Sequence, residues 1–530
     1  MTTEHCAIAT PHALATEAGA AAFRDGGNAV DAALAAAAVL AVAYPHMCSI
    51  GGDVIALVGR PDAEVVAVNG SGAAAAACSP DALRERDPEM PLLGPDTVTV
   101  PGAVRAWETL SGLAGRLPLG VVLAPAIEHA SEGVPVAGSL AYALRETAHE
   151  LTDPGMVSVF TVHGAPLGEG DVLRQPSLAH SLEAIATEGA AALYGGEPGR
   201  RLVGGLRALG SPLTVEDLEA HETELGEPLS GAYRDVEVVT APPNSQGFVL
   251  LETLEALSGV ETIPEPLGPD APLLAEICRL ASRDRDRHLA DPRFAEVPVE
   301  TLTDARHGAD LLRRARSGLD VGGPSLPTIP PPRGDTVAVV TADDEGNAVS
   351  LIQSIFHTFG AGILEPETGI VCHNRGAFFS LDPTSPNVLA PRKRPAHTLM
   401  PVMVRRGGAL IGVQGVMGGR AQPQIHLQLL LRRLRSELPD AALRAPRWVV
   451  GGLEAGQPSD VVRVEASAGE AAIRMLRATG MGVEVLADRD EEVGHGQLVG
   501  RDPDGAFVAG SDPRADGTAV IAARASSSGD

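Results

Sequence analysis

An alanine-dominated run over residues 32–44 limits the folds open to this chain more than any other feature. A helix built from it is apolar on nearly every face, so nearly every face has to be covered by other parts of the protein. The run is shorter than the roughly 20 apolar residues that a helix needs to span a bilayer. It therefore predicts a buried helix inside a layered structure, with Asp31 at its start, where a carboxylate can accept hydrogen bonds from free N–H groups.

The charge balance excludes several classes of partner. The 530 residues include 41 Lys and Arg against 68 Asp and Glu, a formal net charge of −27. A chain this acidic is repelled by phosphate backbones and by anionic lipids, so neither nucleic acid nor a membrane is expected as a partner. Aromatic residues make up only 3%, so the core has to be built from Ala, Val, Leu and Ile. The length predicts about three domains or one large unit of helices and strands.

Cysteine usage and the first residues bear on the compartment. The five cysteines are odd in number, widely scattered and nowhere in a CxxC pair, which argues against a disulfide framework and against a structural zinc site. Residues 1–20 show no basic segment ahead of an apolar one, so no secretory signal is recognised. A cytoplasmic protein with reduced thiols is the expectation.

Proline and glycine mark the sharpest boundary in the chain, at residues 321–334. Such a segment excludes helix and interior strand and is typical of a loop or linker. Directly after it, a β-branched run over 336–342, a polar turn over 343–347 and an apolar run over 348–356 predict a hairpin. Periodicity predicts further strands at 54–58, 236–240, 370–372, 399–404 and 409–413, and helices at 12–24, across most of 103–220, at 249–287 and at 423–435. Helices clustered before the boundary and strands clustered after it predict an α+β fold.

Common cofactor and catalytic motifs are missing from the sequence. No phosphate-binding loop, dinucleotide fingerprint, HExxH or GxSxG motif is present. His373, His397 and His495 lie near glycines, but no two of them have the spacing of metal ligands on one helix or strand. Structural histidines are therefore favoured over metal ligands, and neither a metal nor a cofactor is expected.

Asp335-Thr336 has the arrangement that an N-terminal nucleophile requires. If the chain is cut before Thr336, the freed α-amine, with a pKa of about 7.7 to 8.0, can act as the base for the threonine's own hydroxyl. The alternative is an ordinary strand threonine. Gly418-Gly419, between a predicted strand and a predicted helix, can present successive N–H groups to an oxyanion, and the alternative there is a tight turn.

Nine stretches of the sequence, in order along nearly the whole chain, resemble the γ-glutamyltranspeptidase family of N-terminal-nucleophile hydrolases. They are GGNAVDAALAAAAVLAV (26–42), PHMCSIGGD (45–53), VPGAVRAW (100–107), PPNSQG (242–247), GDTVAVVTADDEGNAVS (334–350), FGAGI (359–363), KRPAHTLMP (393–401), GVMGG (415–419) and GSDPRADG (510–517).

The resemblance implies a four-layer αββα sandwich, made as a precursor that cleaves itself between Asp335 and Thr336. The products would be a large subunit, residues 1–335, ending in the loop at 321–334, and a small subunit, residues 336–530. They would stay together as one structural unit, a heterodimer or a dimer of heterodimers. Thr336 would be the nucleophile in maturation and in turnover, Ser354 would orient it, and Gly418 and Gly419 would bind the oxyanion.

Departures from the family pattern concern the substrate. The arginine with which the transpeptidases hold the glutamyl α-carboxylate corresponds to Ser71, and their serine pair after K-R-P corresponds to His397-Thr398. The asparagine and the aspartate that help to hold the α-amino group correspond to Phe356 and Phe378. Losing contacts at both ends of the glutamyl group should abolish glutamyl preference, since one charge-assisted contact contributes about 1.5 to 3 kcal/mol.

The sequence is thus identified as a member of the glutamyltransferase-like branch, to which acylases and amidohydrolases belong. Phe356 and Phe378 would make the pocket more apolar, while Arg375 and His397 remain as anchors for an acidic or carbonyl-bearing acyl group. A structural role for Arg375 is an open alternative.

The leading hypothesis is an autoprocessed hydrolase that cleaves an amide bond of a small non-glutamyl metabolite. Three alternatives stay open. One is a C–C bond hydrolase acting next to a keto acid, as in relatives from actinobacterial 4-alkyl-proline pathways. The others are a true γ-glutamyltransferase and a catalytically silent binding homologue.

Overall fold

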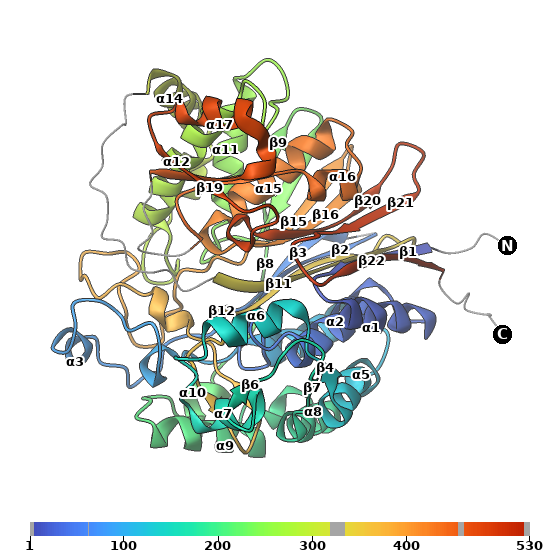
Figure 1. Ribbon diagram of the computed structural model, residues 1–530, viewed down its shortest axis with the longest axis vertical. Coiled ribbons are helices and arrows are strands. Elements are labelled where there is room, and N and C mark those ends of the chain that lie inside the picture. The colour runs from blue at the N-terminus through green and yellow to red at the C-terminus, as the bar shows by residue number, and fades with distance from the viewer. Residues whose placement is uncertain (1–4, 62, 319–333, 454–459, 524–530) are drawn as a thin grey trace.

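Two β-sheets lie face to face in the computed structural model, and helices cover the outer side of each sheet (Figure 1). The structure describes residues 5–61, 63–318, 334–453 and 460–523. Its layers form the predicted αββα sandwich, and the α+β expectation is confirmed. The loop expected at 321–334 lies, apart from Gly334, outside the described residues.

The first sheet carries the predicted nucleophile. It has seven antiparallel strands in the order β22-β1-β11-β12-β2-β3-β8. Their bounds are β22 (Thr518–Ala523), β1 (His5–Thr10), β11 (Gly334–Asp343), β12 (Ala348–His357), β2 (Asp53–Arg60), β3 (Ala63–Gly70) and β8 (Glu224–Gly226). Strands from both sides of position 336 therefore share one sheet.

The second sheet has six antiparallel strands in the order β21-β20-β16-β15-β10-β9. Their bounds are β21 (Phe507–Ser511), β20 (His495–Arg501), β16 (Ala409–Met417), β15 (Val402–Arg406), β10 (Val236–Thr240) and β9 (Leu229–Tyr233). Strand β16 packs on β11 of the first sheet so closely that a Cβ atom on Gly415 would lie 2.8 Å from the Cβ of Ala338. Glycine at 415 thus permits the approach of the two sheets at their centre.

Two helical layers enclose the sheets, as Figure 1 shows below and above them. The layer on the first sheet contains α1 (Ala13–Arg24), α2 (Ala29–Ala43), α4 (Ala103–Ala114), α5 (Leu119–Glu132), α6 (Gly138–Glu146), α7 (Pro154–Phe160), α8 (Pro176–Glu188), α9 (Glu197–Ala208) and α10 (Val215–Glu219). The layer on the second sheet contains α11 (Phe248–Ser258), α12 (Ala271–His288), α13 (Val299–Leu302), α14 (Ala305–Ser317), α15 (Gln422–Leu434), α16 (Pro439–Arg444) and α17 (Gly469–Arg477).

Smaller elements complete the fold. Helix α3 (Pro80–Arg84) projects at one side, and a three-stranded sheet joins the outer layer of the second sheet through β17 (Trp448–Val450), β18 (Val461–Glu465) and β19 (Gly482–Leu486). Two-residue strands pair as β4 (Val134–Pro135) with β7 (Val172–Leu173), β5 (Thr161–Val162) with β6 (Ala165–Pro166), and β13 (Leu364–Glu365) with β14 (Ile370–Val371).

Helix α2 confirms the buried helix, since every one of its residues is buried. It begins at Ala29, ahead of the predicted start, because Asn28 caps it. The Asn28 side chain accepts the N–H groups of Val30 and Asp31, and the Asp31 carboxylate accepts the N–H of Asn28 at 2.9 Å. Helices α1 and α5 and strand β11 pack around it. Because alanine side chains are small, these elements can pack closely against every face of α2.

The predicted hairpin is confirmed by the antiparallel pairing of β11 with β12. Its turn closes where the N–H of Asp343 donates to the carbonyl of Asn347 at 2.9 Å. The strand predicted at 399–404 instead begins at Val402, directly after Pro401, which has no N–H to donate to a ladder. The strand predicted at 370–372 is reduced to the two residues of β14.

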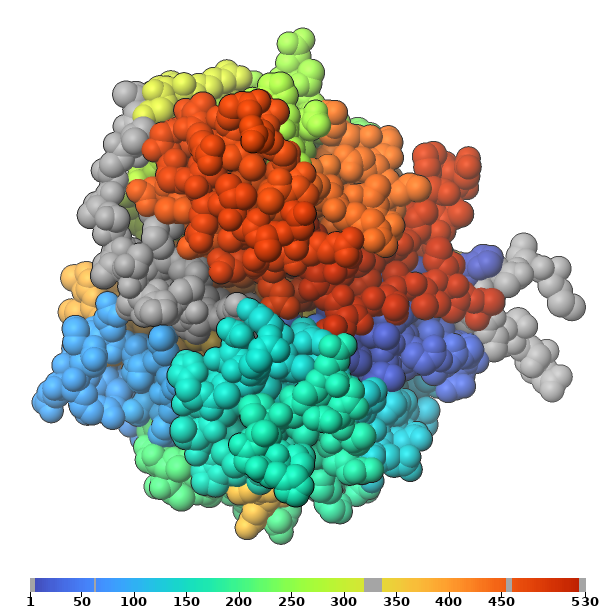
Figure 2. Space-filling view, viewed as in Figure 1, coloured from blue at the N-terminus to red at the C-terminus, as the bar shows by residue number. Residues whose placement is uncertain are grey.

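The surface follows the same division into layers. Residues of the C-terminal part, orange to red in Figure 2, cover the upper half of the face shown, and the segment around residues 100–200 covers much of the lower half. Within the described ranges, no helix combines the length and the apolar character that crossing a bilayer requires.

Buried histidines predict a stability that depends on pH. Burial lowers the pKa of six imidazoles, to about 3 for His46 and His426 and to about 4 for His12, His221, His397 and His495. The unfolded chain binds protons at these sites below pH ~6.5 and the folded chain does not. The contribution of these six histidines to the free energy of unfolding should therefore be at its plateau above pH 6.5. It should fall as pH drops toward 4, by about 1.4 kcal/mol per pH unit for each histidine.

Urea unfolding at pH 7 and pH 5 measures this dependence. Replacing His46, which packs between Tyr44 and Phe359, by phenylalanine should reduce the slope by the contribution of one proton. The matched control is His180→Gln, an exposed position, where the slope should not change. Equal stability of the wild-type protein at the two pH values would contradict the prediction.

Candidate active site

Thr336 lies at the start of β11, next to a bulge in the pairing with β12 that falls between Asp335 and Val337. Bulges re-aim side chains and are frequent beside active sites. The Thr336 side chain is buried, and its Oγ1 donates a hydrogen bond to the Oγ of Ser354 at 3.1 Å. The same Ser354 oxygen accepts the N–H of Phe356 at 2.8 Å. Ser354 on β12 is thus in a position to fix the direction of the threonine hydroxyl.

The glycine pair lies in the turn between β16 and α15. Gly418 has a φ of 150° and Gly419 a φ of 46°, backbone conformations that favour glycine. A Cβ on Gly418 would also collide with the side chain of Ile425. The short 3-10 helix that follows, Gly419–Ala421, packs beside β11. The turn therefore lies next to the strand that carries Thr336, where its N–H groups can serve a developing oxyanion.

Two buried side chains that sequence reasoning missed support this turn. The amide nitrogen of Gln246 donates to the carbonyl of Gly419 at 2.9 Å and to that of Thr398 at 2.7 Å. Arg285, on α12, donates from Nη1 to the carbonyl of Arg420 at 2.6 Å and to the Gln246 Oε1 at 3.3 Å. The only sequence signal for Gln246 is that it belongs to the PPNSQG stretch. No sequence pattern indicates the role of Arg285, because its partners are distant in the sequence.

Ser71 is fully buried and held by neighbouring amides. Its hydroxyl donates to the Oδ1 of Asn69 at 2.7 Å and accepts from the Nδ2 of Asn244 at 3.2 Å. Asn69 and Asn244 also bond to each other at 2.8 Å. Position 71 therefore closes an uncharged network and offers no cation to a substrate carboxylate.

Arg375 is the buried cation of the site. Its guanidinium carbon lies 3.6 Å from the centre of the Phe356 ring and 5.4 Å from that of Phe378, and its Nη2 donates to the hydroxyl of Thr398 at 3.0 Å. The two phenyl rings meet edge to face at 5.6 Å. Because the Phe356 N–H and the Thr336 hydroxyl converge on Ser354, the arginine and its aromatic neighbours are linked to Thr336 through one residue.

His397 is also buried, but both of its ring nitrogens bond within the protein. Nε2 lies 3.2 Å from the Oδ2 of Asp53, and Nδ1 accepts the N–H of Leu399 at 3.3 Å. Burial and the nearby Arg375 lower the pKa of His397 to about 4. Burial alone would raise the pKa of Asp53, but His373 and His397 outweigh it and hold that pKa below its usual range. His397 is therefore placed to position the loop that carries Thr398.

Asp53 is a further residue that the sequence did not single out. It pairs with Ser354 across β2 and β12, and its Oδ1 accepts the N–H of Gly72 at 3.1 Å. The carboxylate thus connects the strand of Ser354, the loop after Asn69 and the ring of His397. Within the described ranges, one group of side chains has donor atoms close enough to share a metal ion, and it lies outside this site, on the outer helices.

The arrangement has the parts of an acyl-transfer site. The buried hydroxyl of Thr336 bonds to the hydroxyl of Ser354, and the glycine turn lies next to the strand that carries Thr336. The buried guanidinium of Arg375 is linked to the same two residues through Phe356. Such a site can attack a carbonyl carbon, stabilise the resulting oxyanion and hold an anionic group of the substrate.

Comparison with known proteins agrees with this reading. The chain is 38% identical over 520 residues to the glutathione hydrolase-like YwrD proenzyme of Bacillus subtilis, covering 97% of this chain and 98% of that protein. It is 37% identical over 527 residues to the oxamate amidohydrolase proenzyme of Klebsiella pneumoniae, again covering 97% and 98%. Among solved structures, the cephalosporin acylase from Bacillus halodurans superposes with a TM-score of 0.88 at 35% identity, over 98% of this chain and 96% of that one.

The family model described as gamma-glutamyltranspeptidase matches residues 15–522, which include both sheets' central strands, the threonine and the glycine turn. By this match, and by relatives that cover almost its whole length, the chain belongs to the gamma-glutamyltranspeptidase family.

Proposed function

We propose that the chain cleaves itself before Thr336 and then hydrolyses an amide bond of a small, non-glutamyl substrate whose acyl group carries a carboxylate. Its family makes the chain a hydrolase, and relatives named as an amidohydrolase and an acylase support amide bonds as the target. The carrying observation is Arg375, a buried cation stacked on Phe356 and joined through Ser354 to the threonine.

Maturation uses the same hydroxyl as turnover. The Thr336 Oγ1 attacks the carbonyl carbon of Asp335, an ester bond forms, and the peptide C–N bond breaks to leave the threonine amine free. Water then hydrolyses the ester and releases the Asp335 carboxylate. The pieces, residues 1–335 and 336–530, would remain together because their strands alternate in the seven-stranded sheet.

In turnover the free α-amine accepts the hydroxyl proton while Oγ1 attacks the substrate carbonyl. The N–H groups of Gly418 and Gly419 bind the oxyanion of the tetrahedral intermediate. The protonated amine then gives its proton to the leaving nitrogen, and the acyl group stays on the threonine as an ester. A water molecule activated by the same amine hydrolyses that ester and restores the free hydroxyl.

Substrate preference follows from the charges that are present. The uncharged Ser71 network cannot form an ion pair with a glutamyl α-carboxylate, whereas Arg375 can form a bidentate pair with a carboxylate elsewhere in the pocket. The relative from Klebsiella pneumoniae is named for oxamate, in which an amide adjoins a carboxylate. A short acidic amide of this kind fits one buried guanidinium with two phenyl rings around it.

A substrate panel tests the proposal. Mass spectrometry first verifies a fragment that begins at Thr336. Initial rates are then measured for oxamate, malonamate, succinamate, for neutral amides in which a methyl group replaces the carboxylate of each, and for a γ-glutamyl anilide. We expect kcat/KM to be highest for an acidic amide and at least about 100-fold lower for the γ-glutamyl anilide, as expected from the loss of charge-assisted contacts of about 1.5 to 3 kcal/mol each. Fast turnover of the anilide, or equal rates for acidic and neutral amides, would refute the proposed preference.

A further inference from the structure

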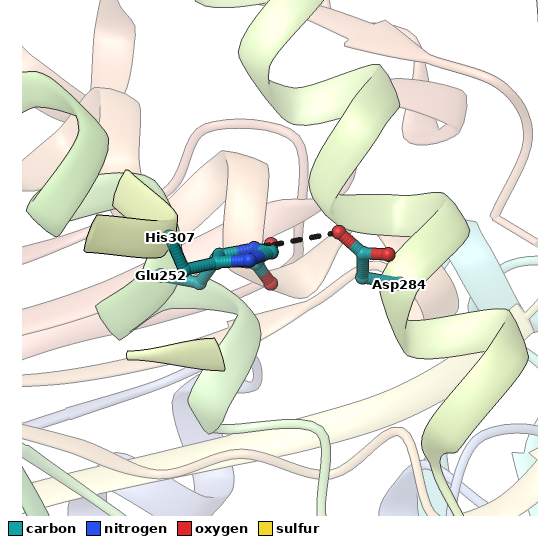
Figure 3. A group of neighbouring side chains, drawn as sticks. All are labelled: Glu252, Asp284 and His307. Atoms are coloured by element: carbon teal, nitrogen blue, oxygen red, sulfur yellow. Dashed lines mark hydrogen bonds and ion pairs between the residues drawn. The ribbon is translucent and has the colours of Figure 1, made fainter. Parts of the chain in front are cut away.

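Three outer helices bring Glu252, Asp284 and His307 together, as Figure 3 shows. Glu252 comes from α11, Asp284 from α12 and His307 from α14. The His307 Nε2 lies 2.8 Å from the Oε1 of Glu252 and 3.5 Å from the Oδ2 of Asp284. One donor atom from each residue lies within 4.8 Å of the other two. No sequence motif predicts this group, because its three residues are far apart along the chain.

The second observation is a buried carboxylate oxygen without a hydrogen-bond partner. The Glu252 side chain is fully buried, and its Oε2 has no hydrogen-bond partner among the described residues, while the Oδ2 of Asp284 has only the 3.5 Å contact with the His307 Nε2. A single imidazole nitrogen faces both carboxylates, and one N–H can be directed at only one of them. A buried carboxylate oxygen without a hydrogen-bond partner destabilises the fold.

Apart from His307 itself, which contacts both carboxylates, two arginines add positive charge on the Asp284 side of the group. Arg287, whose side chain is largely exposed, lies 3.9 Å from the other oxygen of Asp284, and Arg314 on α14 adds a favourable charge near the same carboxyl. A compact cation between the three donors would compensate both carboxylates at once.

From this geometry we propose that Glu252, Asp284 and His307 bind a divalent transition-metal ion of the Zn²⁺ type. One imidazole nitrogen with two carboxylate oxygens is a donor set that suits such an ion, whereas Ca²⁺ and Mg²⁺ prefer oxygen ligands alone. The ion takes the place of the Nε2 proton of His307. With 19% of the His307 side chain exposed, the group has a route to solvent through which an ion and a fourth, water ligand can enter.

The ion would stabilise the helices behind the glycine turn and take no part in the hydrolysis itself. Asp284 immediately precedes Arg285, which holds the carbonyl of Arg420 and the side chain of Gln246. Glu252 lies on the helix that begins at Phe248, directly after Gln246 and Gly247. Joining α11, α12 and α14 at one point therefore fixes two of the elements that support the turn.

Zinc binding to the full-length, chelator-treated protein tests the proposal. Equilibrium dialysis against ZnCl₂ with metal analysis should give one tightly bound ion per chain, and the ion should raise the melting temperature. Glu252→Gln should weaken the site roughly 100-fold or more, since it removes a ligand where even outer partners contribute 10- to 100-fold. The matched control, Glu255→Gln on the same helix, should bind like the wild-type chain.

Asp284→Asn provides a second ligand variant, so that poor folding of one variant does not decide the result. Circular dichroism of the metal-free proteins checks the fold of each. The proposal is overturned if no stoichiometric zinc is bound, or if the folded ligand variants bind zinc as tightly as Glu255→Gln. Amide hydrolysis is not needed for this readout, so the metal site and the proposed function stand or fall separately.

Discussion

Thr336→Ala is expected to stay a single uncleaved chain and to turn over no amide. The substitution removes the Oγ1 that donates to Ser354, the atom that we propose attacks Asp335 in maturation and the substrate in catalysis. Removing the nucleophile from other acyl-transfer enzymes costs on the order of 10⁶-fold in kcat. A denaturing gel after long incubation, with N-terminal sequencing of any smaller band, measures the first effect, and initial rates on an acidic amide measure the second.

Two control variants test whether the loss is specific to the Thr336 hydroxyl. One changes the same position and the other changes another threonine of β11. Thr336→Ser keeps the hydroxyl and should still be processed. Thr341→Ala removes a hydroxyl further along β11 that donates to the carbonyl of Ala29 at 2.7 Å. It should lower the free energy of unfolding by about 1 kcal/mol and leave processing intact. A fragment beginning after position 335 from Thr336→Ala would contradict self-cleavage by this residue.

Arg375→Met is expected to lower kcat/KM for the acidic amide by about 10- to 150-fold and to change the rate on a neutral amide of the same length far less. The methionine fills the space between Phe356 and Phe378 without the charge. The loss corresponds to one charge-assisted contact of about 1.5 to 3 kcal/mol. Arg375→Lys keeps the charge but not the planar fork, so it should recover only part of the rate.

Arg392→Met is the matched control, since Arg392 is exposed in a nearby loop. It should leave both substrates unaffected. The acidic-to-neutral ratio of kcat/KM separates a binding role of Arg375 from a structural one. If Arg375→Met lowered both rates equally, the arginine would act on the fold of the pocket and not on the carboxylate.

Local signals in the sequence predicted the local parts of this fold. The turn at 343–347 and the runs on either side of it are a hairpin, and the alanine run is a buried helix, because these patterns depend on neighbours in the chain. The strand at His5–Thr10 was not predicted, since its pairing partners, β11 and β22, lie more than 300 residues away. Strand β20, which places Gly496 opposite Val416 and pairs with β21 just after it, was not predicted either.

The candidate site shows the same limit. Thr336, Ser354 and the glycine turn could be selected as candidates because the hairpin and the family motifs surround them. The roles of His397 and Asp53 could not be predicted from the spacing of residues in the sequence, since their hydrogen bond joins positions 344 residues apart. The support of Gly419 by Gln246, and of Gln246 by Arg285, likewise exists only once the outer helices are folded onto the second sheet.

The order of strands in the first sheet sets a time for maturation. Strand β22, which follows β16 and β20 in the sequence, pairs along the full length of β1, and β1 is the other neighbour of β11. A nascent chain that has just produced the Thr336 hairpin still lacks β22, the glycine turn and the second sheet's β16 and β20. If the chain cleaves itself as proposed, cleavage at Thr336 in the folded sheet follows the synthesis of β16, β20 and β22. Chains that stop early would keep the threonine locked in a peptide bond.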